Sequence, residues 1–200
     1  SIEDTSKVEE FELKKTVASA SVKDDNLAVI FADNELALYS LSSKELLLKE
    51  KAGDALAIDS RIANPYFLGG VVIFPTLDGK VIIVNLENKK RLRTTIVSSE
   101  DKFNNILYFN IVDQKVIAAT AYKILSMDQK EAHEKYEIRS VAYNGENLFL
   151  ATKQGEIVSL RPNLQLNAKL KFPFAHFLGL VTKDDKVYIL EKEGYLIVAP

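Results

Sequence analysis

Residues 70–95 constrain the fold more than any other part of this chain. Two apolar segments, 71–74 and 81–86, flank a turn that contains Asp78 and Gly79, and a third segment, 91–96, alternates polar and apolar residues. Asp-Gly between two β-branched runs is a strong hairpin signal, because a tight primed turn needs residues with positive φ. The stretch therefore predicts three consecutive antiparallel strands.

This unit recurs along the whole chain. The second strands of successive units start near residues 27, 71, 116, 148 and 187, so the units begin 44, 45, 32 and 39 residues apart. The repeats cover residues 17–51, 54–97, 104–137, 138–172 and 175–199. Each repeat holds four short strands, except that the fifth is one strand short.

Alternation and turn residues place the individual strands. The predicted strands span residues 8–16, 17–22, 27–32, 36–41, 46–51, 55–60, 71–74, 81–86, 91–96, 106–112, 116–120, 123–127, 131–137, 138–143, 147–152, 156–160, 165–172, 175–182, 187–191 and 195–199. For residues 8–16, a short amphipathic helix is the alternative interpretation.

A period of about 40 residues with four short strands is typical of a β-propeller. The inner strands are apolar on both faces, and a single sheet cannot bury both faces by itself. Radial stacking covers each face with the next sheet. We therefore predict an all-β fold, a β-propeller of about five four-stranded antiparallel blades, in a single domain over residues 1–200.

The strand count leaves two architectures open. The spare strand 8–16 could pair with 195–199 and complete the last blade, which would close a five-bladed ring and remove its weakest edges. The strand arithmetic favours this closure slightly. The alternative is that the chain is a piece of a larger propeller.

Charge and composition exclude several classes of function. The net charge is −2, from 26 basic and 28 acidic residues, so nothing draws the whole chain to nucleic acid or to an anionic membrane. There is no cysteine, which excludes thiol catalysis and thiolate metal sites. No apolar run approaches a membrane span, and residues 1–15 do not form a signal peptide. The chain does not begin with methionine, so an upstream targeting or lipid-anchoring segment stays open.

Two segments carry a family resemblance. Residues 36–46 read LALYSLSSKEL, and residues 79–92 read GKVIIVNLENKKRL. Both resemble the repeat of pyrroloquinoline-quinone-type propellers, which has a glycine turn, a strand ending Ala-Leu-Asp and a turn such as Thr-Gly-Lys. Residues 154–160 and 124–131 match this repeat more loosely. The resemblance covers most of the chain, although each motif mainly encodes turns.

The departures from this repeat narrow what the resemblance implies. The chain has no tryptophan, so the ring of stacked tryptophans between blades is missing, as is the Trp-Asp signature of WD repeats. No motif matches the cofactor-binding or catalytic residues of the quinone dehydrogenases. The chain is more similar to the non-enzymatic branch, which includes the propeller lipoprotein of the outer-membrane β-barrel assembly machinery. That resemblance implies a protein-binding role and a periplasmic or outer-membrane location, with a cytoplasmic location as the alternative.

Residues that could carry chemistry have structural explanations. His133 and His176 each lack a second ligand at metal-binding spacing. Asp24-Asp25 and Asp184-Asp185 occupy equivalent turns, where an aspartate bonds its own backbone. Ser40, Ser126 and Ser159 share one repeat position, which indicates a structural role. We therefore predict no catalytic residue, no metal site and no cofactor.

The candidate partner-binding residues lie in expected loops and turns. Aromatic side chains at loop tips can anchor a protein interface, or they can cover the core. The connection 61–69 is expected at the end of the ring opposite the other inter-repeat connections. A dense basic turn is the second candidate, with a solvated turn as the alternative. The candidates are Tyr66, Phe67, Phe103, Phe174, Lys89, Lys90 and Arg91.

These observations support a non-enzymatic protein-binding scaffold of the bacterial cell envelope, with another protein as its partner. One alternative is a propeller enzyme or small-molecule binder that uses the central channel, which requires several carboxylates or a metal near the axis. The other alternative, an accessory protein of a redox complex, depends on the repeat resemblance alone.

Overall fold

The computed structural model describes residues 10–199, which form β-strands joined by turns and connections. The first sheet holds β1 (Val17–Lys23), β2 (Asn26–Phe31), β3 (Glu35–Ser40) and β4 (Leu46–Lys51). The second holds β5 (Tyr66–Leu68), β6 (Val71–Pro75), β7 (Lys80–Asn85) and β8 (Arg91–Ile96). The third holds β9 (Tyr108–Val112), β10 (Lys115–Ala119), β11 (Lys123–Met127) and β12 (Glu131–Lys135).

Two further sheets complete the described chain. The fourth holds β13 (Ile138–Tyr143), β14 (Leu148–Thr152), β15 (Glu156–Leu160) and β16 (Leu166–Lys171). The fifth holds three strands, β17 (Phe177–Lys183), β18 (Lys186–Glu191) and β19 (Leu196–Ala199). Every pairing is between neighbours in sequence and is antiparallel, which confirms the predicted all-β fold of consecutive hairpins. Residues 10–199 contain no helix that is long and apolar enough to cross a membrane.

The two tight turns predicted from Asp-Gly and Asp-Asp differ in backbone geometry. Gly79 has φ +80° in the turn between β6 and β7, but Asp78 has no positive φ and the flanking pair is Pro75 with Val81, so the predicted primed turn at Asp78-Gly79 is wrong. Asp184 and Asp185 have φ +49° and +59°, and they join β17 to β18 with Lys183 opposite Lys186. Two consecutive positive φ angles define the primed turn that suits the twist of a hairpin. The paired aspartates therefore form a turn, as predicted.

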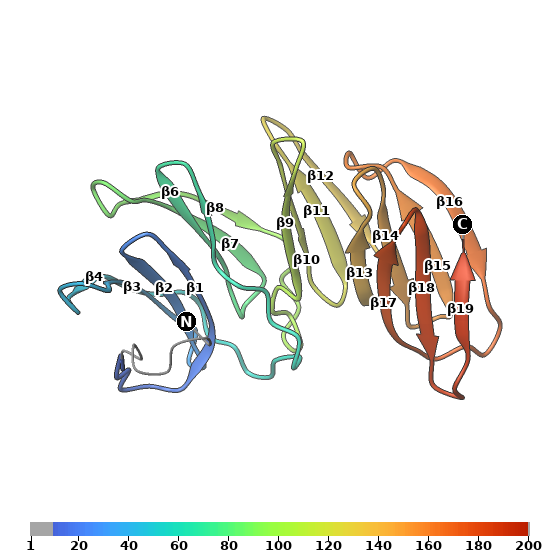
Figure 1. The fold of residues 1–200 in the computed structure, drawn as a ribbon, viewed down its shortest axis with the longest axis horizontal. Coiled ribbons are helices and arrows are strands. Elements are labelled where there is room, and N and C mark those ends of the chain that lie inside the picture. The colour runs from blue at the N-terminus through green and yellow to red at the C-terminus, as the bar shows by residue number, and fades with distance from the viewer. Residues whose placement is uncertain (1–9, 200) are drawn as a thin grey trace.

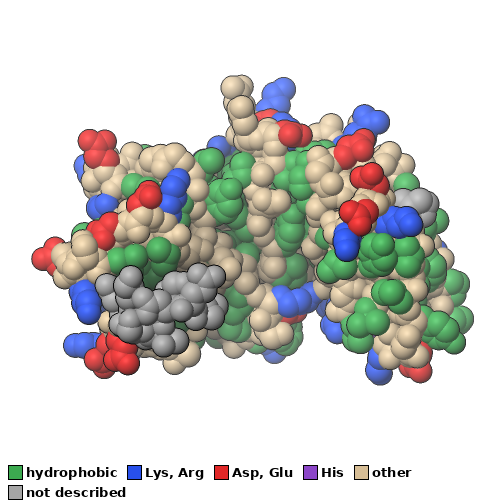
Figure 2. All heavy atoms as spheres, in the orientation of Figure 1, with side chains coloured by type: hydrophobic (Ala, Val, Ile, Leu, Met, Phe, Trp, Pro, Cys, Tyr) green, Lys and Arg blue, Asp and Glu red, His purple; other side chains and the backbone are tan. Residues whose placement is uncertain are grey.

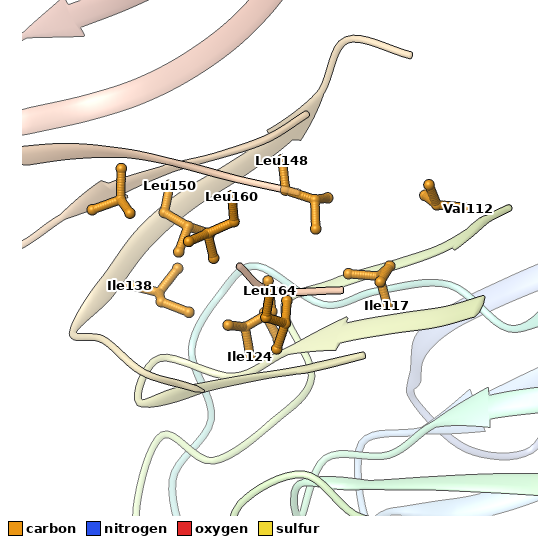
Figure 3. Packing of buried hydrophobic residues seen from close by; sticks show 10 residues of the cluster. Val112, Ile117, Ile124, Ile138, Leu148, Leu150, Leu160 and Leu164 are labelled. Carbon is orange, nitrogen blue, oxygen red and sulfur yellow. The ribbon is translucent and has the colours of Figure 1, made fainter. Parts of the chain in front are cut away.

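The five sheets stand side by side in an arc (Figure 1). Each neighbouring pair shares a cluster of buried aliphatic side chains. Figure 3 shows the cluster between the third and fourth sheets, where Ile117 and Ile124 face Ile138, Leu150 and Leu160. Similar clusters lie between the first and second, second and third, and fourth and fifth sheets. Stacking therefore buries the facing sides of neighbouring sheets, as the apolar inner strands require.

The arc is open, so the preferred prediction of a closed five-bladed ring is wrong. The first and last sheets lie at opposite ends of the molecule (Figure 1). Residues 10–16 form no strand beside β19. Phe11 instead packs edge-on against Tyr39, with ring centroids 5.4 Å apart, and Leu13 packs against Val29, Phe31 and Ala37. Residues 8 and 9 of the predicted strand lie outside the described residues.

The predicted strand at residues 55–60 is also wrong. These residues lie in the connection between β4 and β5, and the inner strand of the second sheet is β5. Gly69 has φ +54° and forms the turn into β6 with Gly70, so the residues just before this turn pair with β6. The glycine turn thus sets the register, and Tyr66 and Phe67 belong to a strand rather than to a loop tip.

A buried asparagine joins the first sheet to the second. Asn34 is fully buried in the turn between β2 and β3, with φ +60°. Its amide nitrogen donates to the Gly53 carbonyl (2.8 Å) and to Oδ1 of Asp78 (2.9 Å). Its Oδ1 accepts from the Leu77 backbone N–H (2.9 Å). One side chain of the first sheet therefore satisfies polar groups in the connection before β5 and in the turn between β6 and β7 of the second sheet.

The same network sets the protonation of Asp78. Burial raises the pKa of this carboxyl group, but bonds from Lys80, Thr76 and Asn34 outweigh that effect and hold the pKa below its usual value. The Thr76 hydroxyl donates to Asp78 over 2.6 Å, and Lys80 forms an ion pair with it. The charged form of Asp78 therefore stabilises the folded state.

This linkage predicts how stability depends on pH. Because the pKa of Asp78 is lower in the folded state, its contribution is present above about pH 4 and is lost as the pH falls through the depressed value. Urea unfolding of the wild type and Asp78→Asn at pH 6, 4 and 3 checks this. The stability difference between the two proteins should be largest at pH 6 and smallest at pH 3. A difference that stays constant with pH would contradict it.

Candidate functional site

The connections between sheets gather at one end of the arc. In consecutive antiparallel strands the turns alternate between the two ends of a sheet, so the connections that lead into β5, β9, β13 and β17 share one end. The turns between β14 and β15 and between β18 and β19 lie at this end too. Two adjoining cavities of about 400 and 480 Å³ open there, and they share Arg139 and Leu178. We call this region the channel-mouth site.

The lining of the channel-mouth site comes from the fourth and fifth sheets and from the connections that lead into β5, β9 and β17. Its members are charged, apolar or small polar side chains that reach the same two cavities. They are Ile58, Asp59, Ser60, Arg61, Phe103, Arg139, Thr152, Lys153, His176, Phe177, Leu178 and Lys192.

A buried asparagine holds one wall of the site in place. Asn105 is fully buried, and its Oδ1 accepts from the Asp59 backbone N–H (2.7 Å). Its amide nitrogen donates to the carbonyl oxygens of Asp59 (3.3 Å) and Arg61 (2.7 Å). The Phe103 backbone N–H donates to the Ala57 carbonyl (2.7 Å). These bonds join the connection before β5 to the connection before β9, so this wall of the site is preorganised.

An ion pair orients the first arginine of the site. The Asp59 carboxylate accepts from Nε of Arg61 (2.8 Å), from its backbone N–H (3.0 Å) and from its Nη2. These bonds from Arg61 hold the pKa of Asp59 below its usual value, against a burial that raises it, and the charge of Arg139 lowers it further. Nη1 of Arg61 is buried without a hydrogen-bond partner in the described structure.

The other cations come from the fourth and fifth sheets. Arg139 lies in β13, and its Nε donates to the Phe177 carbonyl (3.2 Å), which ties β13 to the start of β17. Lys153 lies in the turn between β14 and β15, with its Nζ 5.8 Å from the centre of the Tyr122 ring. Lys192 follows β18, and its backbone N–H donates to the His176 carbonyl (2.9 Å). Cationic groups from separate repeats therefore converge on one opening.

The aromatic residues predicted to bind a partner occupy different places. Phe103 lines the channel-mouth site, is 47% exposed and has φ +53°. Phe174 is 96% exposed with φ +66°, in the connection between β16 and β17 that leads to the same end. Tyr66 is half exposed on β5, and its ring lies 5.9 Å from that of Phe109. Phe67 packs against the cluster between the first two sheets.

The basic turn predicted as a second candidate lies at the other end of its sheet. Lys89 and Lys90 are in the turn between β7 and β8, and Nζ of Lys89 bonds the Leu86 carbonyl. Arg91 pairs with Glu50 of the first sheet. Its neighbour Arg93 pairs with Glu131 of the third sheet over 2.6 Å. Much of this charge therefore links neighbouring sheets along their outer strands, and the structure does not bring it near Phe103 or Phe174.

His133 and the three serines lie in ordinary structural surroundings, whereas His176 lines the channel-mouth site. His133 is exposed on β12, with Nε2 3.5 Å from Glu131. The hydroxyl groups of Ser40 and Ser126 donate over 2.6 Å to Asp25 and to the Pro162 carbonyl, and the Ser159 hydroxyl accepts from Asn167 (3.4 Å). Within residues 10–199, no three His, Asp or Glu side chains are grouped so that they could hold a metal ion.

Comparison with solved structures identifies the fold. BamB from Moraxella catarrhalis superposes with a TM-score of 0.73 at 14% identity, over 90% of this chain and 62% of that one. The C-terminal WD40 domain of Sif2 gives a TM-score of 0.68 at 12% identity, over 91% of this chain and 54% of that one. This chain has a β-propeller fold. Each four-stranded sheet is thus a blade, and the arc matches part of each ring.

Sequence relatives come from Helicobacter pylori. The plasminogen-binding protein PgbB of one strain is 36% identical over 188 residues, which is 92% of this chain, and PgbB of a second strain is 35% identical. The chain spans about a third of the length of these relatives, 35% and 34%. No family model matches the chain, so membership of the pyrroloquinoline-quinone-type repeat family stays a prediction.

Proposed function

We propose that this chain is part of a non-enzymatic propeller that holds another protein through the connection-bearing end of its blades. The channel-mouth site carries the proposal. It combines fixed cationic groups with exposed apolar side chains on a rigid scaffold, a composition that suits a protein interface. The name of the PgbB relatives, which are plasminogen-binding proteins, supports a protein partner.

Plasminogen is the first partner to test. With the 200-residue chain immobilised, we expect saturable binding of purified plasminogen in a biosensor experiment, and no saturable binding of serum albumin at the same concentration. If plasminogen does not bind, chemical crosslinking in an extract of the cell envelope, followed by mass spectrometry, tests for another specific partner. Failure to find any specific protein partner in both experiments would contradict the proposed function.

We also propose a periplasmic or outer-membrane location. Support comes from the resemblance of residues 36–46 and 79–92 to the propeller lipoprotein, and from relatives named for binding plasminogen. Fractionation of cells that produce the protein from its own gene tests this. The protein should appear with the periplasmic or outer-membrane fraction, and recovery only with a cytoplasmic marker enzyme would overturn the proposal.

We further propose that the arc is part of a larger propeller, which is the second of the two architectures that the strand count left open. The fifth blade has three strands where the others have four, and its outward face is apolar. The structure of BamB extends beyond the part that matches, since the chain covers 62% of it. A further blade packed on the fifth would bury this face in the way that the neighbouring blades bury theirs.

A further inference from the structure

The channel-mouth site carries a charge opposite to that of the whole chain. The chain has a net charge of −2. Four cationic side chains line the site, Arg61, Arg139, Lys153 and Lys192, against the single carboxylate of Asp59. Positive charge gathered in a concave region raises the local concentration of anions and steers them to it. The site is therefore suited to a negatively charged ligand.

The arginine side chains of the site are held before any ligand arrives. Asn105 fixes the backbone of Asp59 and Arg61, and Asp59 fixes the guanidinium group of Arg61. The carbonyl of Phe177 accepts from Arg139 and limits its movement. Little side-chain entropy is then lost when these groups bind an anion, and a planar guanidinium group suits a carboxylate. The unpartnered Nη1 of Arg61 also favours additional negative charge nearby.

The apolar part of the lining narrows the class of ligand. Phe103 and Leu178 are 47% and 51% exposed, and Ile58 lies beside them in the same cavity. A free inorganic anion would leave this apolar surface in water. A peptide that carries a carboxylate next to an apolar side chain would bury this apolar surface as well as pair with the cations. The cavities of about 400 and 480 Å³ are large enough for a few side chains.

We propose that the channel-mouth site binds an acidic segment of the partner protein. Carboxylates of this segment lie between Arg61 and Arg139 and against Lys153 and Lys192, while a neighbouring apolar residue packs on Phe103 and Leu178. This proposal rests on the proposed protein-binding function and adds the site and the chemistry of the partner. Recognition of this kind depends on charge pairs that are partly desolvated by apolar neighbours.

A direct binding experiment tests the ligand class. The probe is a fluorescein-labelled peptide, Gly-Ser-Glu-Leu-Glu-Leu-Gly-Ser, compared with the same peptide carrying Gln in place of Glu. Fluorescence anisotropy should show at least about tenfold tighter binding of the Glu peptide, weakening as salt increases. Equal affinities would overturn the proposal. Displacement of the peptide by inorganic phosphate at matched ionic strength, as effective as by unlabelled peptide, would show a general anion site and would also overturn it.

Substitutions locate the binding. Arg139→Gln and, separately, Lys192→Gln should each lower the affinity for the Glu peptide by about five- to tenfold, because each removes one positive charge from the site. Lys90→Gln is the matched control, since it removes one charge from the distant turn between β7 and β8, and it should leave the affinity unchanged. Unchanged melting temperatures show that the variants fold. If neither site variant weakens binding, or if Lys90→Gln weakens it equally, the assignment is wrong.

The two proposals can fail separately. If a specific protein partner is captured by the wild type and equally well by Arg139→Gln and Lys192→Gln, the protein-binding function stands and the channel-mouth assignment falls. If the Glu peptide binds with the expected dependence on these residues but no specific protein partner is found, the site stands and the scaffold function falls.

Discussion

Replacing Gly79 by alanine is expected to lower the free energy of unfolding by about 2–4 kcal/mol. Gly79 has φ +80°, a conformation that costs energy for any residue with a Cβ. A Cβ at this position would also lie 2.3 Å from Nδ2 of Asn104 and 2.5 Å from the carbonyl oxygen of Ser98. The backbone oxygen cannot move aside without distorting the connection that leads to β9.

Gly70 provides the matched control for this prediction. It also lies in a turn between two strands of the second blade, but a Cβ there would meet no atom within 4 Å. Gly70→Ala should change stability by less than about 1 kcal/mol. Denaturation in guanidinium chloride measures both variants. Equal effects of the two substitutions on the free energy of unfolding would contradict this prediction.

We expect the 200-residue chain to associate with itself through the outward face of the fifth blade, and we expect charged substitutions on this face to weaken that association. Five side chains share this face by register, because Tyr188 lies opposite Val181 and Val198, and Leu190 lies opposite Leu196. Val181 is 61% exposed and Leu196 60%. Figure 2 shows hydrophobic side chains gathered at this end of the molecule. An exposed apolar face beside a free strand edge favours association between molecules.

The double variant Val181→Lys with Leu196→Lys tests this expectation. Sedimentation velocity over a range of concentrations should show association of the wild type, and the apparent dissociation constant of the variant should rise by at least about tenfold. Leu92→Lys with Leu166→Lys is the control, because these exposed leucines lie on the outer strands β8 and β16 of two separate blades. A wild type that stays monomeric at all concentrations would contradict the prediction.

Local patterns predicted the consecutive hairpins well, but they wrongly predicted strands at residues 10–16 and 55–60. The alternation around Phe11 and Leu13 correctly indicated one buried side, since both residues are half-buried between exposed neighbours. It did not indicate which blade they would cover. The alternation at residues 55–60 predicted a strand, but Gly69 and Gly70 place the turn, and therefore the inner strand, nearer to β6. Tertiary pairing overrode the local pattern in both segments.

The channel-mouth site could be predicted only in part. Phe103 was a candidate because an aromatic residue in a connection is visible in the sequence. Arg61 and Arg139 come from connections and strands far apart in the chain, and only the curvature of the arc brings them together. Asn105 gave no signal either, because a buried asparagine that holds another segment looks like any polar loop residue. No local motif encodes this convergence.

The outward face of the first blade is covered by other residues of the chain, whereas the outward face of the fifth blade is exposed. Leu13 and Phe11 already cover the outward side of the first blade, where Lys15 also bridges Asp33 and Glu35. No segment among residues 10–199 covers the corresponding side of the fifth blade, where Val181 and Leu196 are exposed. A further sheet could therefore pack on the fifth blade without displacing any of these contacts. A sheet packed on the outward side of the first blade would require residues 10–16 to detach.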